Sequence, residues 1–247
     1  PVVGAAAADD RAVTFQVRHS LMALPEDGYQ PRPHNPGCGL YAQQFSNDSV
    51  PLGTSRLQAY TVRHRLQPKV DPTRSVTSVG VRRLTHDGRP LLTPVRPIVY
   101  YLDRRCPSPI REALMEGASW WEAAFEAAGW YQAFRVELMP EDMDPLDARY
   151  NVIEWTHRTT RSWSYGQPLV DPRTGEILRG YVVLGSGRGR QDYILAEAVL
   201  GRGADLTGDP ILEAVLARLR QLAAHEVGHT LGLAHNFAAS VANRSSA

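Results

Sequence analysis

Residues 225–235 read HEVGHTLGLAH, and the interpretation of the whole chain starts from this stretch. On a helix, positions four apart lie on one face, so His225 and His229 can present their imidazoles to one metal ion. Glu226 lies about 100° around the helix from His225, where its carboxylate can reach a water molecule on that metal. The spacing therefore predicts two metal ligands and a general base on one helix.

A third histidine follows the point where this helix is expected to end. Gly232 can adopt the left-handed backbone conformation found after a helix, and the reversed chain can then bring His235 back to the metal. Three neutral imidazoles leave the fourth tetrahedral position of Zn²⁺ open for water, as in catalytic zinc sites. The sequence thus predicts a Zn²⁺ cofactor held by His225, His229 and His235, with Glu226 as the catalytic residue.

The extended motif resembles that of the metzincin zinc peptidases. Residues 225–237 (HEVGHTLGLAHNF) resemble, more narrowly, the bacterial Met-zincin-like domain of large secreted or periplasmic zinc-dependent metallopeptidases. The likeness also covers residues 97–103 (PIVYYLD), 120–129 (WWEAAFEAAG), 147–155 (DARYNVIEW) and 170–177 (VDPRTGEI). It implies a zincin-like fold, a polypeptide substrate, and an extracellular or periplasmic location, although no signal peptide is visible in the chain.

One feature of metzincins is missing from the sequence. Metzincins carry a methionine-containing turn beneath the metal, C-terminal to the third histidine, whereas the four methionines here all precede the motif. Either the chain is a fragment of a longer protein, or the floor of the site is built differently. In the first case, we expect the downstream C-terminal part of the same protein to act as a partner that completes the site. On this interpretation the loop of His235 is weakly supported. Residues 1–247 are then expected to bind zinc more weakly than a longer chain and to be inactive, or nearly so, alone.

Composition excludes several classes of protein. The chain has 247 residues, 43% of them hydrophobic, and a formal net charge of +1, so nothing suggests nucleic acid or an anionic membrane as a partner. No apolar run approaches the length of a membrane span. Cys38 and Cys106 can form a disulfide or remain free thiols. A sharper hypothesis is that the Cys38 thiolate occupies the open metal position, as in the matrixin relatives of this motif.

Strand and helix patterns alternate in the second part of the chain. The expected strands are residues 95–102, 134–138, 151–156 and 176–184. An amphipathic helix with Ser108 as its N-cap should end at Gly129, and the motif helix should begin at Asp209 and Pro210. We expect an α+β, zincin-like fold: a mixed, mainly parallel twisted sheet with an antiparallel edge strand, a backing helix and an active-site helix.

Proline and glycine content places a domain boundary near residue 90. Residues 1–90 combine strand patterns with long irregular stretches and are expected to form an N-terminal β-rich segment. Residues 91–247 are expected to form the N-terminal part of a metzincin-like catalytic domain, without its methionine turn.

The resemblance also suggests where a substrate binds. In metzincins, the strand that corresponds to residues 176–184 is antiparallel to its neighbours and borders the cleft. An exposed strand edge can pair with an extended peptide, and an internal strand is the alternative interpretation. The candidate substrate-binding residues are Gly180, Tyr181, Val182, Val183, Leu184 and Gly185.

These observations favour a zinc-dependent endopeptidase that hydrolyses peptide bonds with a metal-activated water and Glu226 as general base. A non-catalytic zinc-binding fragment or interaction module, and a zinc hydrolase of a non-peptide amide, remain as alternatives. No Walker phosphate loop and no Gly-x-Ser-x-Gly nucleophile elbow is present. Some acidic residues could form a calcium cluster, but their spacing does not fit an EF-hand and favours a solvated acidic loop. These are Asp103, Asp142, Asp144 and Asp147.

Overall fold

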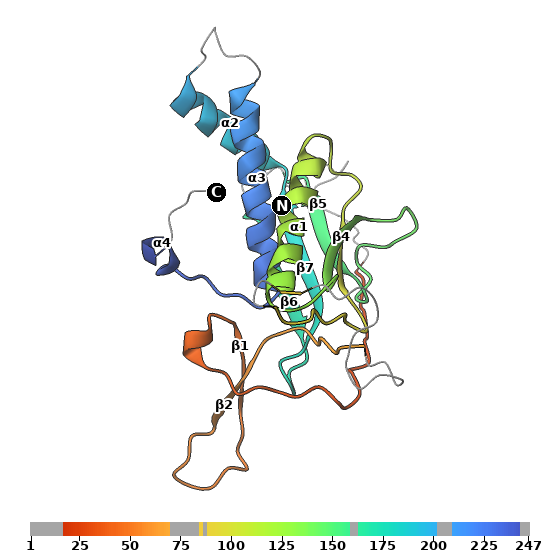
Figure 1. Cartoon of the computed structure of the whole chain (residues 1–247), viewed down its shortest axis with the longest axis vertical. Coiled ribbons are helices and arrows are strands. Elements are labelled where there is room, and N and C mark those ends of the chain that lie inside the picture. The colour runs from red at the N-terminus through yellow and green to blue at the C-terminus, as the bar shows by residue number, and fades with distance from the viewer. Residues whose placement is uncertain (1–16, 70–83, 86–87, 159–162, 202–208, 243–247) are drawn as a thin grey trace, which may run out of the picture.

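The computed structural model describes residues 17–69, 84–85, 88–158, 163–201 and 209–242 (Figure 1). No helix within these ranges is both long enough and apolar enough to cross a membrane. The elements in chain order are η2 (Pro36–Cys38), β1 (Ala42–Ser46), β2 (Leu57–Thr61), β3 (Ile98–Leu102), α1 (Ile110–Ala127), β4 (Phe134–Leu138), β5 (Asn151–Thr156), β6 (Tyr165–Val170), β7 (Ile177–Gly185), α2 (Gly187–Leu200), α3 (Pro210–Thr230) and α4 (Ala239–Ala242).

The larger sheet has the strand order β4-β3-β5-β7-β6. Strand β3 runs parallel to β4 and to β5, and β5 runs parallel to β7. Strand β6, at one edge, is antiparallel to β7. The expected α+β fold with a mixed, mainly parallel sheet and an antiparallel edge strand is therefore confirmed.

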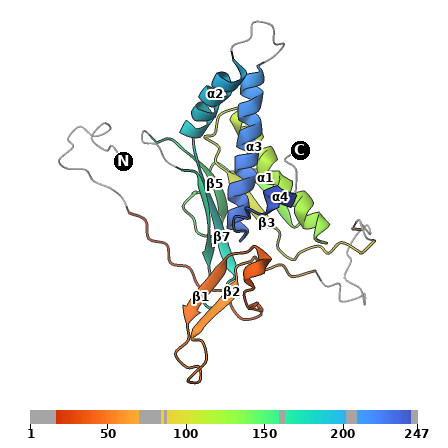
Figure 2. The same cartoon turned by 90° about the vertical axis from the view of Figure 1, so that its left-hand side faces the viewer.

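Helices α1 and α3 lie side by side over one face of this sheet (Figures 1 and 2). The core between them contains Tyr100 of β3, Phe134 of β4, Leu114 of α1 and Leu219 of α3, all fully buried. Burial of each such side chain contributes about 1.5–3 kcal/mol, so this shared core fixes α3 against the sheet. Helix α1 is the expected backing helix, and α3 is the expected active-site helix.

Glycine allows two close approaches within this core. A Cβ at Gly117 of α1 would lie 2.1 Å from the carbonyl oxygen of Arg220, so the backbones of α1 and α3 touch there. A Cβ at Gly180 of β7 would lie 2.0 Å from the Tyr100 hydroxyl, which instead reaches Thr230 Oγ1 at 2.8 Å. Gly117 thus lets α1 pack closely on α3, and Gly180 leaves room for the Tyr100 hydroxyl that contacts Thr230 at the end of α3.

Both ends of α3 form as the sequence predicts. The Asp209 side chain accepts a hydrogen bond from the Leu212 backbone amide at 3.0 Å, and Pro210 is the first residue of the helix. After the last turn, Gly232 has a φ of +102°, which favours glycine over other residues. The chain therefore reverses between His229 and His235.

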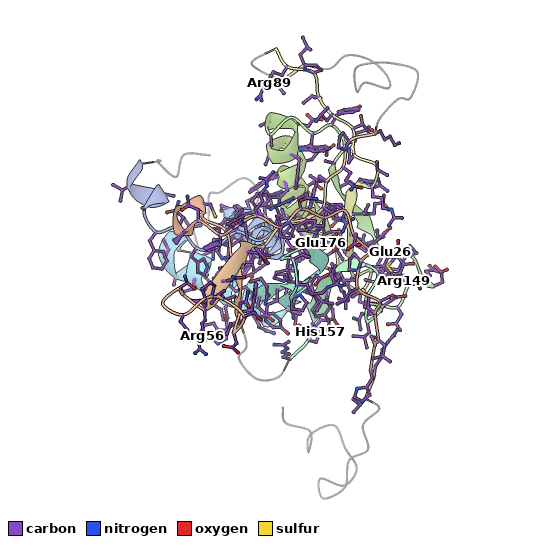
Figure 3. All side chains as sticks on the ribbon, turned by 90° about the horizontal axis from the view of Figure 1, so that it is seen from below. Glu26, Arg56, Arg89, Arg149, His157 and Glu176 are labelled. Carbon is purple, nitrogen blue, oxygen red and sulfur yellow. The ribbon has the colours of Figure 1, made fainter. Side chains whose placement is uncertain are left out.

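Strands β1 and β2 form a separate antiparallel pair. In both views this pair lies near the C-terminal end of α3 (Figures 1 and 2). The segment after β2 is joined to the larger sheet, because the Arg65 guanidinium donates two hydrogen bonds of 2.7 and 2.8 Å to the carboxylate of Glu176. Figure 3 shows Glu176 towards the middle of the molecule seen from below, whereas Arg56 lies at its outer edge.

Two details differ from the sequence-based expectations. The N-cap of α1 is Pro109 rather than Ser108, and it makes no side-chain capping bond. Residues 165–170 form β6, which the sequence pattern did not predict because Gly166 and Pro168 are residue types depleted in strands. An edge strand tolerates proline, since one side of its backbone is not paired within the sheet.

Candidate metal centre

The three histidines of the motif converge on one point. Nε2 of His229 lies 3.0 Å from Nε2 of His225 and 3.1 Å from Nε2 of His235, and the remaining pair is also 3.1 Å apart. Lone pairs brought this close repel one another unless a cation lies between them. An ion at the usual Zn–N distance of about 2.0–2.1 Å can contact all three nitrogens. Among the described residues, these three histidines are the group of side chains whose ligand atoms lie close enough together to hold a metal ion.

The protonation of His229 suits this role. Its Nδ1 lies 2.8 Å from the backbone carbonyl oxygen of Leu233, which can only accept a hydrogen bond. Nδ1 must therefore carry the hydrogen, and Nε2 presents its lone pair to the centre of the triangle. Metal-bound histidines usually have such a partner for the second ring nitrogen, because it fixes both tautomer and orientation.

The charge state of His225 also suits a metal ligand. Burial lowers the pKa of His225, and the nearby His229, His235 and Arg218 lower it further. An imidazole must be neutral to bind a metal, so this environment favours the form that can act as a ligand.

Glu226 lies beside the histidines, and its neighbour on the other side is Gly166 of β6. Its side chain is buried, and burial raises its pKa, while His229 and a hydrogen bond from the Gly166 backbone act in the opposite direction. A raised pKa makes the carboxylate a better proton acceptor near neutral pH. Glu226 is therefore placed against β6, with the electrostatic environment expected for a general base.

Tyr41 enters the site from the N-terminal segment, and sequence reasoning missed it. Its hydroxyl oxygen lies 3.0 Å from Nδ1 of His229, and the two rings are 5.9 Å apart between centroids. Burial raises the pKa of Tyr41, and the charge of Glu226 raises it further, so the phenol stays protonated. Tyr41 precedes His229 by 188 positions, and no local pattern links them.

Two hollows flank the histidines. A cavity of about 520 Å³ is lined by Trp121, all three histidines and Phe237, among others. A second cavity of about 250 Å³ lies on the side of Glu226 and is also lined by His225, Trp163 and Arg218. The site is therefore open on both sides of His225.

The two cysteines are free thiols. Cys38 is exposed, whereas Cys106 is buried, and burial raises the pKa of Cys106 to about 12. Cys38 ends η2, next to the segment that contacts the His235 loop, but it is not among the clustered ligands. The hypothesis of a Cys38 thiolate bound at the metal therefore has no support in this arrangement.

Three of the four acidic residues that suggested a calcium cluster have arginine partners, namely Asp103, Asp144 and Asp147. Asp103 is buried and accepts hydrogen bonds from the guanidinium of Arg105. Asp147 accepts hydrogen bonds from the guanidinium and the backbone amide of Arg149, the shortest at 2.6 Å. The expectation of a solvated loop is therefore wrong for Asp103, whose carboxylate lies inside the protein.

The expectation that residues 180–185 form an exposed edge is also wrong. They lie within β7, which pairs with β5 on one side and with β6 on the other. Strand β5 pairs with residues 181–185 and β6 with residues up to 183, so both edges are occupied at Tyr181, Val182 and Val183. Tyr181 donates its hydroxyl to Glu154, and the remaining residues pack in the interior of the sheet, namely Gly180, Val182, Val183, Leu184 and Gly185. The exposed edge next to α3 belongs to β6.

Comparison with known proteins agrees with the site geometry. Residues 209–247 match the family model described as Met-zincin, and residues 3–69 match a family described as a domain of unknown function (DUF5117). Neither the curated proteins nor the solved structures contain a match to the chain. The first match spans α3 and all three histidines. The recognition of a metzincin-like, metallopeptidase-like domain in this part of the chain is therefore confirmed.

Proposed function

We propose that this protein is a zinc-dependent endopeptidase. The observation that carries the proposal is the triangle of Nε2 atoms from His225, His229 and His235, next to the buried carboxylate of Glu226. Three neutral imidazoles with an adjacent carboxylate are the ligand set and base of hydrolytic zinc sites. The open surroundings leave room for a substrate.

Each residue has a defined part in the reaction. The three histidines would hold Zn²⁺, and the ion would lower the pKa of water towards about 7 and polarise the scissile carbonyl. Glu226 accepts the proton of the attacking water and then delivers it to the nitrogen of the leaving amine. The Gly166 backbone lies beside Glu226 and favours the charged form of its carboxyl, the form that accepts a proton. The carbon–nitrogen bond breaks, and a carboxylate and a free amine are released.

The edge of β6 is the proposed place for the substrate backbone. Strand β6 lies against α3 at Glu226, since a Cβ at Gly166 would be 2.0 Å from the Glu226 carbonyl oxygen. An extended peptide added to this edge would run past the catalytic base. The hollows on both sides of His225 support cleavage within a chain rather than at its end.

Hydrolysis of an unfolded protein tests the proposal. The purified chain is expected to cut reduced, carboxymethylated protein at internal bonds, to stop when a chelator removes the metal, and to recover when Zn²⁺ is restored. Mass spectrometry of the products distinguishes internal cuts from removal of terminal residues. Zinc binding with no cleavage of any peptide would favour the non-catalytic module instead. Cleavage of small amides, but not of peptides, would favour the non-peptide amide hydrolase.

A further inference from the structure

The segment before β1 forms backbone hydrogen bonds to the loop that carries the third ligand. The Tyr41 amide donates to the Gly232 carbonyl at 2.7 Å, and the Ala234 amide donates to the Gly39 carbonyl at 2.9 Å. These bonds make an antiparallel bridge between Leu40 and Leu233. The chain just before His235 is therefore held like a short strand, rather than being the weakly supported loop that the sequence suggests.

The same segment also reaches a ligand on α3. Nδ1 of His229 lies 2.8 Å from the Leu233 carbonyl oxygen and 3.0 Å from the Tyr41 hydroxyl oxygen. The hydrogen on Nδ1 can be shared by these two acceptors. Both acceptors depend on the bridge. Leu233 is one of its two paired residues, and Tyr41 directly follows the other, Leu40.

The bridge is in turn fixed to the rest of the protein. The Val62 amide donates to the Tyr41 carbonyl at 2.9 Å, and the Val62 carbonyl oxygen would lie 2.5 Å from a Cβ at Gly232. One residue further on, the Arg63 amide donates to the Gly175 carbonyl at 3.1 Å, at the turn before β7. A continuous set of backbone contacts thus connects the larger sheet to the His235 loop.

We propose that residues 39–41 are a working part of the metal site, and that Tyr41 is a positioning residue that holds the ring of His229. These residues belong to the N-terminal region that matches a family described only as a domain of unknown function, and they give this region a role. That role is to support the metal ligands of the C-terminal region. It goes beyond the proposed peptidase activity, because it concerns metal binding and holds whether or not the chain cleaves peptides.

The test compares two single-atom changes in the Glu226→Gln background, which prevents self-digestion. Tyr41→Phe removes the hydroxyl beside His229 and keeps the ring. Tyr60→Phe is the matched control, because Tyr60 lies in β2, which pairs with the strand that follows Tyr41, and packs on Phe45 with ring centroids 5.4 Å apart. Affinity for Zn²⁺ is measured by competition with a coloured chelator, and the visible spectrum of Co²⁺-loaded protein reports on ligand geometry.

Tyr41→Phe is expected to weaken zinc binding by about tenfold and to change the Co²⁺ spectrum. Loss of such an outer partner typically weakens affinity by about 10- to 100-fold, and Leu233 still holds Nδ1 here, so the low end applies. The melting temperature of the metal-free protein should stay the same, which separates positioning from general destabilisation. Tyr60→Phe should match the parent in all three measurements. Unchanged affinity and spectrum in Tyr41→Phe, or an equal loss in both variants, overturns the proposal.

Discussion

Gly166 of the edge strand touches Glu226 of the active-site helix in two ways. The Gly166 backbone lowers the pKa of the Glu226 carboxyl, and a Cβ on Gly166 would lie 2.0 Å from the Glu226 carbonyl oxygen. Real Cβ atoms do not approach that closely, so glycine is needed for β6 to lie on α3. The orientation of the proposed base therefore depends on a residue in another element.

Gly166→Ala is expected to reduce activity while the protein retains its metal. The added methyl group must push β6 away from α3, which takes the Gly166 backbone away from Glu226 but leaves the three histidines in place. We expect peptidase activity to fall at least tenfold and zinc content to remain close to one per chain. Gly187→Ala is the control, because nothing lies within 4 Å of a Cβ at Gly187. Equal activity in the two variants would show that the contact with β6 does not orient the base.

Glu226→Gln is expected to separate metal binding from chemistry. Glutamine keeps the shape of the side chain but cannot accept the proton of water, so activity should fall by at least about a hundredfold. The zinc content should remain near stoichiometric, because Glu226 is not one of the converging ligands. Elemental analysis of the purified protein measures this directly.

The double variant His225→Ala/His229→Ala provides the opposite case. It removes two nitrogens of the triangle and should lose the metal at chelator concentrations that leave Glu226→Gln loaded. If the double variant and the unmodified protein contained equal zinc, the assignment of the three histidines as ligands would be wrong.

Local sequence rules were sufficient to predict the convergence of the three histidines and the ends of α3. The four-residue spacing of His225 and His229 acts through helix geometry alone, and Asp209 and Gly232 act through capping and backbone conformation. Each rule involves a few neighbouring residues, so no knowledge of the remaining fold is needed. The parallel sheet followed in the same way from the alternation of strands and helices.

Contacts between distant segments could not be predicted in this way. Strand β6 was missed because Gly166 and Pro168 look unlike strand residues, and their suitability depends on the neighbouring α3 and on the exposed edge. As a consequence, the edge position was given to residues 180–185. Tyr41 was missed because it reaches His229 through the folding of the N-terminal segment, and the sequence contains no pattern at that separation.

His64 is expected to make stability depend on pH. Burial lowers its pKa to about 4, and its Nε2 is buried without a hydrogen-bond partner in the described part of the chain. In the unfolded chain a histidine has a pKa of about 6.5. Between these values the unfolded state binds more protons, so the free energy of unfolding falls as the pH drops from about 6.5 to 4.

Urea unfolding of the metal-free protein measures this dependence. Between pH 7.5 and 5, the unmodified protein should lose up to about 2 kcal/mol more stability than His64→Gln, which does not titrate. The other histidines contribute equally to both proteins, so the difference isolates His64. Parallel pH curves for the two proteins would show that His64 is solvated in the folded state.

Gly232→Ala is expected to weaken metal binding more than its backbone conformation alone explains. A residue other than glycine at a φ of +102° costs about 1–3 kcal/mol. In addition, the new Cβ would lie 2.5 Å from the Val62 carbonyl oxygen and must displace the bridge that positions His235.

The matched control is Gly129→Ala. Gly129 follows α1 with a φ of +96°, and nothing lies within 4 Å of a Cβ there, so it shares the backbone cost without the close contact. Both variants should therefore lose thermal stability in the metal-free state, but Gly232→Ala alone should lose zinc affinity, by about tenfold or more. Because the two substitutions add the same methyl group after a helix, equal zinc affinity in both would mean that the approach of Val62 to the His235 loop has no effect on the metal.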